Sequence, residues 1–163
     1  MKYKLAVSPI NWRNNDLPAI GKSNTMEKFL TEASQIGYDG VEMGAQYPKE
    51  ADKLQALLGP YNLALASGWF EIGLLQKTPA EQMAEISPHV ELLRAMGCKL
   101  VVICETQGTT VHGAMDKSAN SRHILTADEW TLLTKRLDEF AVMLKDIDMP
   151  MSYHPHIATV IES

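Results

Sequence analysis

The stretch Lys99–Glu105, KLVVICE, is a short apolar run that is rich in β-branched residues and ends in an acidic residue. Val and Ile favour extended strands, and a continuous apolar run is typical of a strand covered on both faces. Helical patterns flank this run. One begins at the capping box Thr78–Glu81 and ends near Met96, and another begins at the capping box Thr126–Glu129. The stretch therefore predicts one strand of a parallel sheet, with a crossover helix before and after it.

The same alternation of strand and helix extends along the whole chain. Two further helices are predicted, one with Asn24 as its N-cap and Gly37 as its C-cap, and one over Glu50–Leu58. The four helices separate five apolar, β-rich runs: Lys4–Ser8, Gly40–Met43, Leu63–Ser67, Lys99–Glu105 and Met149–His154. The resulting order, β-α-β-α-β-α-β-α-β, predicts a parallel α/β sheet with right-handed crossovers.

Two architectures fit this order, an open doubly wound sheet and part of a (β/α)8 barrel. The nucleotide-binding versions of the open sheet lack support, because the sequence contains neither GxGxxG after a strand nor GxxxxGK[ST]. A complete barrel typically needs about 250 residues. The 163 residues of this chain supply four βα units and a fifth strand, and we expect them to form a single domain.

Composition narrows the class of protein. The chain is 45% hydrophobic and 21% charged, and its net charge of -5 argues against nucleic acid as a partner. No apolar run approaches the roughly 20 residues of a membrane helix, so we expect no membrane partner. The cysteines, Cys98 and Cys104, form neither a CxxC pair nor a disulfide framework, which favours a cytoplasmic protein.

Polar and aromatic side chains collect where the predicted strands end, and parallel α/β folds bind their ligands at that edge. The candidates are Asn11 and Trp12 after the first strand, Glu42 in the second, Trp69 after the third, Glu105 in the fourth, and His154 and His156 at the end of the fifth. The two tryptophans could plug the end of a barrel or stack on a sugar-like ring. An ionised Glu105 would need a cation or ligand hydroxyls as partner.

Two histidine-containing segments add further candidates. His154 and His156 bracket Pro155, and because strand residues i and i+2 share a face, both imidazoles could enter one cavity as ligands of Zn, Mn, Co or Fe. The same pair could instead be two solvated loop histidines. His112 lies in the long segment Thr106–Leu125 and is either a surface residue or a site residue.

Five segments in this order resemble a known family: SPINWRNNDLP, GYDGVEMG, LALASGWFE, VVICETQGTTVHG and SYHPHIATVIES. Together they are similar to inosose dehydratase and its relatives among the xylose-isomerase-like (β/α)8 TIM barrels. The resemblance extends from Ser8 to Glu162. It implies a hydro-lyase that removes water from 2-keto-myo-inositol in inositol catabolism, with a divalent metal, Mn or Co before Zn or Mg.

The resemblance also implies roles for individual residues. His154, in the His-Pro pair after the fifth strand, stands where the family takes a metal ligand, and His156 is a neighbouring ligand, substrate contact or catalytic residue. Glu105 becomes a catalytic acid/base candidate. Asn11, Trp12, Glu42, Trp69 and His112 become substrate-binding candidates for a polyol or keto-sugar. Ile157-Ala158 departs from the Met-Gly expected after these histidines.

The family takes further metal ligands from strands six to eight, which the sequence does not contain. The chain therefore resembles the N-terminal portion of a barrel, either as part of a longer protein or as a subunit completed by a partner, and a homo-oligomer is compatible with it. We expect the chain alone to bind metal weakly and to lack dehydratase activity. A sugar isomerase or epimerase on the same scaffold and a non-catalytic polyol-binding half-barrel are the alternatives.

Overall fold

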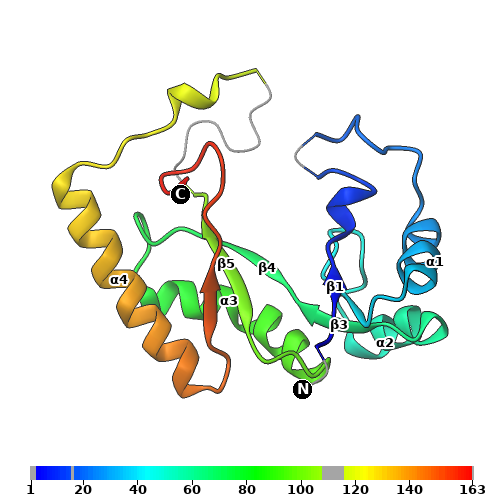
Figure 1. Cartoon of the computed structure of the whole chain (residues 1–163). Coiled ribbons are helices and arrows are strands. Elements are labelled where there is room, and N and C mark those ends of the chain that lie inside the picture. Colours follow the sequence, from blue (N-terminus) through cyan, green and yellow to red (C-terminus); the bar gives the residue numbers. More distant parts are fainter. Residues whose placement is uncertain (1–2, 16, 108–115, 163) are drawn as a thin grey trace. The chain divides into compact units, whose positions relative to one another are not determined.

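The computed structural model describes residues 3–15, 17–107 and 116–162. Its helices and strands, drawn in Figure 1, are β1 (Ala6–Val7), α1 (Met26–Ile36), β2 (Gly40–Glu42), α2 (Ala51–Leu58), β3 (Ala64–Ser67), β4 (Trp69–Ile72), α3 (Pro79–Ala95), β5 (Val101–Glu105), α4 (Ala127–Asp146) and β6 (Met151–Tyr153), with short 3-10 turns at Pro9–Asn11, Gly59–Tyr61 and Ala119–Ser121.

The chain packs as two compact units. The first unit is Met1–Gly68 with Glu91–Cys98, and the second unit is Trp69–Val90 with Lys99–Ser163. Each unit contains one three-stranded sheet, in the order β1-β2-β3 in the first and β4-β5-β6 in the second. All four strand pairings are parallel, as the alternation of elements predicts.

One strand was not predicted from the sequence. Residues Trp69–Ile72, placed in the loop after the third strand, form β4, in which Trp69 pairs with Val102 and Ile72 with Glu105. Trp, Phe and Ile favour the pleated surface of a sheet. Gly68 separates the two strands β3 and β4.

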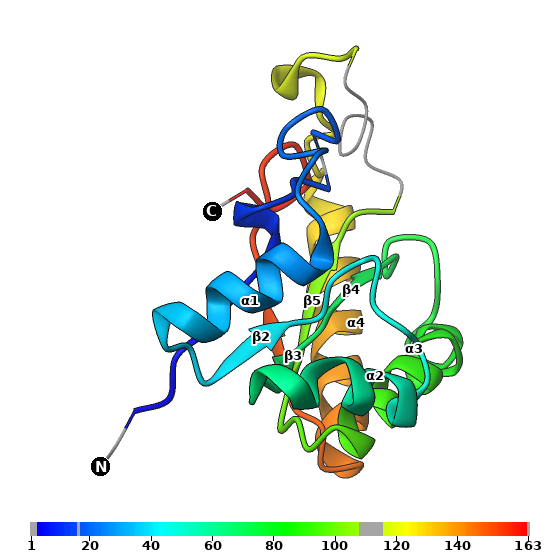
Figure 2. The same ribbon diagram turned by 90° about the vertical axis from the view of Figure 1, so that its right-hand side faces the viewer.

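Both sheets carry apolar cores built from the predicted strands and helix stripes. Figure 2 shows α1 and β2 of the first unit, whose core includes Phe29, Leu30, Ala33, Val41, Leu54, Leu58 and Leu65. In the second unit α4 runs alongside β6 (Figure 1), over a core of Ile72, Leu74, Ile86, Ile103, Leu133, Phe140, Leu144 and Met149. Trp130, in the first turn of α4, is 42% exposed.

Two predicted capping boxes and the predicted C-cap of α1 are confirmed, and the N-cap of α1 is displaced by a residue. Thr78 with Glu81 and Thr126 with Glu129 form the predicted capping boxes. Gly37 ends α1 with a left-handed φ of 95°. The N-cap of α1 is Thr25 rather than Asn24, because the Thr25 hydroxyl accepts from the Lys28 amide while Asn24 binds the Trp12 carbonyl.

The capping box of α4 gives a direct stability prediction. Replacing Thr126 with alanine removes the acceptor for the Glu129 amide and should lower the free energy of unfolding by about 1 kcal/mol. Thr131→Ala is the control, because the Thr131 hydroxyl only bonds back to the Ala127 carbonyl within the helix. Urea unfolding curves that show equal losses for the two variants would contradict the assigned cap.

Candidate active site

Glu105 ends β5 and is the only carboxylate without any exposed surface among the described residues. Its Oε2 accepts a hydrogen bond from the Leu74 amide at 2.6 Å. Its Oε1 is buried and has no hydrogen-bond partner in the part of the chain that the structure describes. A buried polar atom without a partner is costly, and such atoms are concentrated where a ligand or a reaction supplies the missing partner.

Burial controls the protonation of this carboxyl. Removal from water raises the pKa of Glu105 from 4.5 to about 8, although hydrogen bonds from the Leu74 and Leu75 amides and the charge of Lys77 oppose this rise. At neutral pH the side chain is therefore mostly protonated. A carboxyl with a pKa near the working pH can both donate and accept a proton, as general acid–base catalysis requires.

The turn that binds Glu105 is itself held from two sides. Arg136 of α4 donates through Nη1 to the Leu74 carbonyl at 2.8 Å and to the Leu75 carbonyl at 3.3 Å. The fully buried Gln82 of α3 accepts from the Gly73 amide at 2.8 Å. A Cβ at Gly73 would collide with the Gln107 side chain, so this close approach requires glycine. These contacts fix the amides that face the carboxylate.

Strand β6 supports the backbone of Glu105. The Glu105 amide donates to the phenol oxygen of Tyr153 at 3.2 Å, and burial raises the pKa of Tyr153, so the phenol stays protonated. The two strands are in register, with Ile103 opposite Tyr153. On the other side, the Thr106 hydroxyl donates to Glu71 of β4 at 3.2 Å. The carboxyl end of this sheet thus gathers polar groups from three adjacent strands.

The predicted histidine pair lies at the end of β6. The His154 amide continues the ladder by donating to the Ile103 carbonyl at 2.8 Å. The imidazole rings of His154 and His156 have centroids 5.7 Å apart, and the His156 ring stacks on Trp69 at 5.8 Å with an interplanar angle of 21°. His156 Nδ1 lies 2.9 Å from the Ile157 carbonyl. Trp69, His154 and His156 therefore form one cluster, although Trp69 belongs to a strand rather than to a loop.

The donor set near these histidines is incomplete for a metal. Imidazole nitrogen suits Mn, Co or Zn, but a protein site needs three or more ligands. Within residues 3–15, 17–107 and 116–162, no three His, Cys, Asp or Glu side chains converge as they would around one ion. The described residues thus provide at most part of a metal site.

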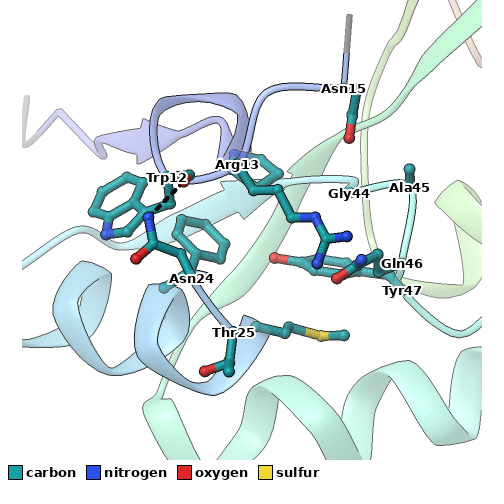
Figure 3. Close-up of a pocket in the computed structure, with 12 residues that line it drawn as sticks. Trp12, Arg13, Asn15, Asn24, Thr25, Gly44, Ala45, Gln46 and Tyr47 are labelled. Carbon is teal, nitrogen blue, oxygen red and sulfur yellow. Dashed lines mark hydrogen bonds between the residues drawn. The ribbon is translucent and has the colours of Figure 1, made fainter. Parts of the chain in front are cut away.

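The remaining candidates belong to the first unit. The Trp12 indole N–H donates to Glu32 Oε2 at 2.5 Å, and its ring packs on Phe29 at 4.8 Å, so much of this side chain is used in packing. Asn11 is exposed in the turn after β1, and Glu42 is half-buried at the end of β2. Figure 3 shows a pocket beside Trp12 that neither Asn11 nor Glu42 lines. His112 lies outside the described residues.

Sequence reasoning missed four residues of the Glu105 environment: Gln82, Thr106, Arg136 and Tyr153. Tyr153 could have been found, because it precedes the histidines in a predicted strand. Gln82 and Arg136 lie on helices, where a polar residue that binds a distant turn cannot be told from a solvated one by sequence alone.

The chain has the fold of part of a xylose isomerase-like TIM barrel. A protein of this class from Mycobacterium smegmatis, solved in complex with magnesium, aligns with a TM-score of 0.60 and 14% identity over 99% of this chain and 58% of that chain. Within the described ranges, no helix is both long and apolar enough to span a bilayer.

Comparison with known sequences shows a more specific similarity, to inosose dehydratases. The chain is 35% identical over 163 residues to an inosose dehydratase of Clostridium botulinum, covering 99% of this chain and 54% of that protein. It is also 35% identical to an inosose dehydratase of Lacticaseibacillus casei, covering 100% of this chain and 55% of that protein. No family model matches the sequence. The resemblance to inosose dehydratase is therefore confirmed, and the chain spans about half the length of these relatives.

Proposed function

We propose that the chain is the N-terminal part of a hydro-lyase that removes water from an inositol-derived ketone, 2-keto-myo-inositol, in inositol catabolism. Two inosose dehydratases at 35% identity support the substrate class. The observation that carries the chemistry is Glu105, a buried carboxyl with one oxygen fixed by the Leu74 amide and the other without a partner in the described part of the chain.

In this proposal Glu105 is the general acid that donates a proton to the hydroxyl that leaves as water. The imidazole of His156 would take a proton alpha to the ketone to give an enolate, whose electron pair would then expel the β-hydroxyl as the C–O bond breaks. A protonated Glu105 would donate through Oε1 to the departing oxygen, so that it leaves as water. The resulting carboxylate would be stabilised by the amides of Leu74 and Leu75, which already bind this side chain.

The other site residues are proposed in subordinate roles. His156 is the second proton-transfer group, and Trp69, which stacks on it, presents an apolar surface to a carbocyclic ring. Asn11, Trp12, Glu42 and His112 are proposed as further contacts to the hydroxyls of the substrate. No step in the mechanism is assigned to these four residues.

A divalent metal, Mn or Co, is proposed for the whole protein, with His154 as one ligand; when bound, such an ion would polarise the ketone oxygen. Because the described residues hold no group of three ligands, we predict that the chain alone retains less than one equivalent of Mn or Co after dialysis against micromolar metal. Elemental analysis tests this prediction, with His154→Ala as the matched variant. Stoichiometric metal that the variant also retains would exclude His154 as a ligand.

The experiment that tests the function compares two forms of the chain. One is the chain alone, and the other is the chain fused to the part of the L. casei inosose dehydratase that it does not cover. We expect ultraviolet absorbance of a dione from 2-keto-myo-inositol only with the fused form. Interconversion of ketohexoses without dione would favour an isomerase or epimerase. No turnover of either substrate by the folded fusion would contradict an enzymatic role.

We also propose that the protein works in the cytoplasm. Cys98 and Cys104 are buried and unpaired, and burial raises the pKa of both thiols, that of Cys104 to about 12. Such thiols are unreactive and need no oxidising compartment.

A further inference from the structure

The first unit contains a pocket lined by one cationic side chain together with neutral polar and apolar side chains. The pocket opens between the segment after β1, the start of α1 and the segment after β2. Its empty volume is about 380 Å³, which includes space at the mouth that is open to solvent. Figure 3 shows the side chains around it. Twelve residues line it: Pro9, Trp12, Arg13, Asn15, Asn24, Thr25, Met26, Phe29, Gly44, Ala45, Gln46 and Tyr47. One of them is a cation and none is an acid.

Arg13 has no carboxylate partner among the described residues. Its half-buried guanidinium faces the side-chain amide of Gln46, whose oxygen, placed toward Arg13, accepts from Nη1 at 2.8 Å and from Nη2 at 3.1 Å. An amide neutralises no charge, so Gln46 orients the cation but no described residue compensates its charge. The planar guanidinium, with further N–H donors to spare, suits a planar or tetrahedral oxyanion.

Tyr47 supplies a second and independent indication of a ligand. Its side chain is only 4% exposed, and its hydroxyl has no hydrogen-bond partner in the described part of the chain. In Figure 3 the phenol oxygen points across the pocket toward the side that Asn24 and Trp12 line. Burial raises the pKa of this phenol, so the group stays protonated and available as a donor. A buried hydroxyl without an acceptor is costly unless a ligand completes it.

The N-terminus of α1 adds a partial positive charge beside the pocket. Thr25 and Met26 line the pocket, and α1 runs for 11 residues, long enough for its N-terminus to favour an anion. The Lys28 amide is already capped by Thr25, which leaves the earlier amides of the first turn as donors. Of the two acidic residues nearby on α1, Glu32 is bonded to the Trp12 indole, and neither Glu27 nor Glu32 lines the pocket.

We propose that this pocket binds the oxyanion group of a small molecule, a phosphate or a carboxylate, between Arg13, Tyr47 and the N-terminus of α1. The neutral hydroxyls of an inositol ring would leave the charge of Arg13 without a counterion among the described residues, so the proposed ligand differs in charge from a polyol, although Trp12, a proposed substrate contact, also lines this pocket. The ligand group would accept from the guanidinium and from the Tyr47 hydroxyl together.

Titration of the chain with inorganic phosphate and, separately, with acetate tests the proposal, and calorimetry and amide NMR shifts are the readouts. We expect saturable binding of at least one of these anions, with shifts centred on Arg13, Tyr47 and the first turn of α1. Arg13→Gln should weaken binding roughly 10-fold or more, because a charge-assisted hydrogen bond is lost. Tyr47→Phe, which keeps the packing, should weaken it several-fold.

The control variants remove a cation and a phenol from positions of the first unit outside the pocket. Lys53→Gln removes a cation and Tyr61→Phe removes a phenol, and neither residue lines the pocket, so affinity should stay within about twofold of the parent chain. Tighter binding of phosphate than of acetate would identify a phosphorylated ligand, and the reverse order a carboxylate. Saturation by neither anion, saturation by myo-inositol alone, or unchanged affinity in a folded Arg13→Gln variant would overturn the proposal.

Discussion

Replacing Glu105 with glutamine should reduce dehydration of 2-keto-myo-inositol by the fused form of the chain by roughly 100- to 10,000-fold, the range typical of a lost general acid–base group. Glutamine keeps the size of the side chain and can still accept from the Leu74 amide, but it cannot release or take up a proton at any working pH. The measurement is the initial rate of dione formation at saturating substrate. The loss should fall on kcat rather than on KM.

A surface carboxylate provides the matched control for this substitution. Glu139→Gln makes the same chemical change on α4, where the side chain is exposed and lies 4.0 Å from Lys135. Its rate should equal that of the parent protein. If Glu105→Gln retained activity within about threefold of the parent while Glu139→Gln behaved as expected, Glu105 could not be the proton-transfer group.

The second large effect concerns stability against pH. Because burial raises the pKa of Glu105 from 4.5 in water to about 8 in the folded chain, the native state holds this proton more tightly than the unfolded state does. The corresponding stability is complete below pH 4.5 and is lost as pH rises toward 8. A tenfold difference in proton affinity corresponds to about 1.4 kcal/mol, so the loss can approach about 4 kcal/mol between pH 5 and pH 8.

The comparison with Glu105→Gln isolates this contribution from all other titrating groups. The variant carries a neutral side chain throughout the range, so the difference in free energy of unfolding between parent and variant should change steadily with pH, to the disadvantage of the parent at high pH. Urea unfolding at pH 5, 6, 7 and 8 measures it. Parallel pH profiles for the two proteins would mean that Glu105 has an ordinary pKa.

The sequence predicted those features whose interacting residues lie within a few positions of one another in the chain. The capping boxes at Thr78 and Thr126 were found because their partners lie three residues away. Glu105 was selected as a candidate because an acidic residue ends an apolar strand. The alternation of a strand predicted that the His154 and His156 rings lie close together; the rings are 5.7 Å apart, but both residues follow the end of β6 at Tyr153. Where a signal was ambiguous by one position, as at Asn24 and Thr25, the choice of cap depended on a contact to a distant carbonyl.

The features that were missed depend on contacts between distant parts of the chain. Strand β4 forms because Trp69–Ile72 has β5 to pair with, and Gly68 alone does not disclose that partner. The contacts of Arg136 with the Leu74 and Leu75 carbonyls span more than 60 residues. The same holds for the pocket of the first unit, where parallel pairing of β1 and β2 brings the segments of Arg13 and Tyr47 to one edge.

Direct titration of the Glu105 carboxyl is the most decisive measurement, because both the proposed chemistry and the pH dependence rest on that one group. Carbon-13 NMR of the glutamate side-chain carboxyls, with Glu105→Gln used to assign the resonance, follows it in the intact chain. The structure predicts a midpoint of about 8, far above that of exposed glutamates. A midpoint near 4.5 would contradict the account, since Glu105 would then be ionised at neutral pH and could not serve as the acid.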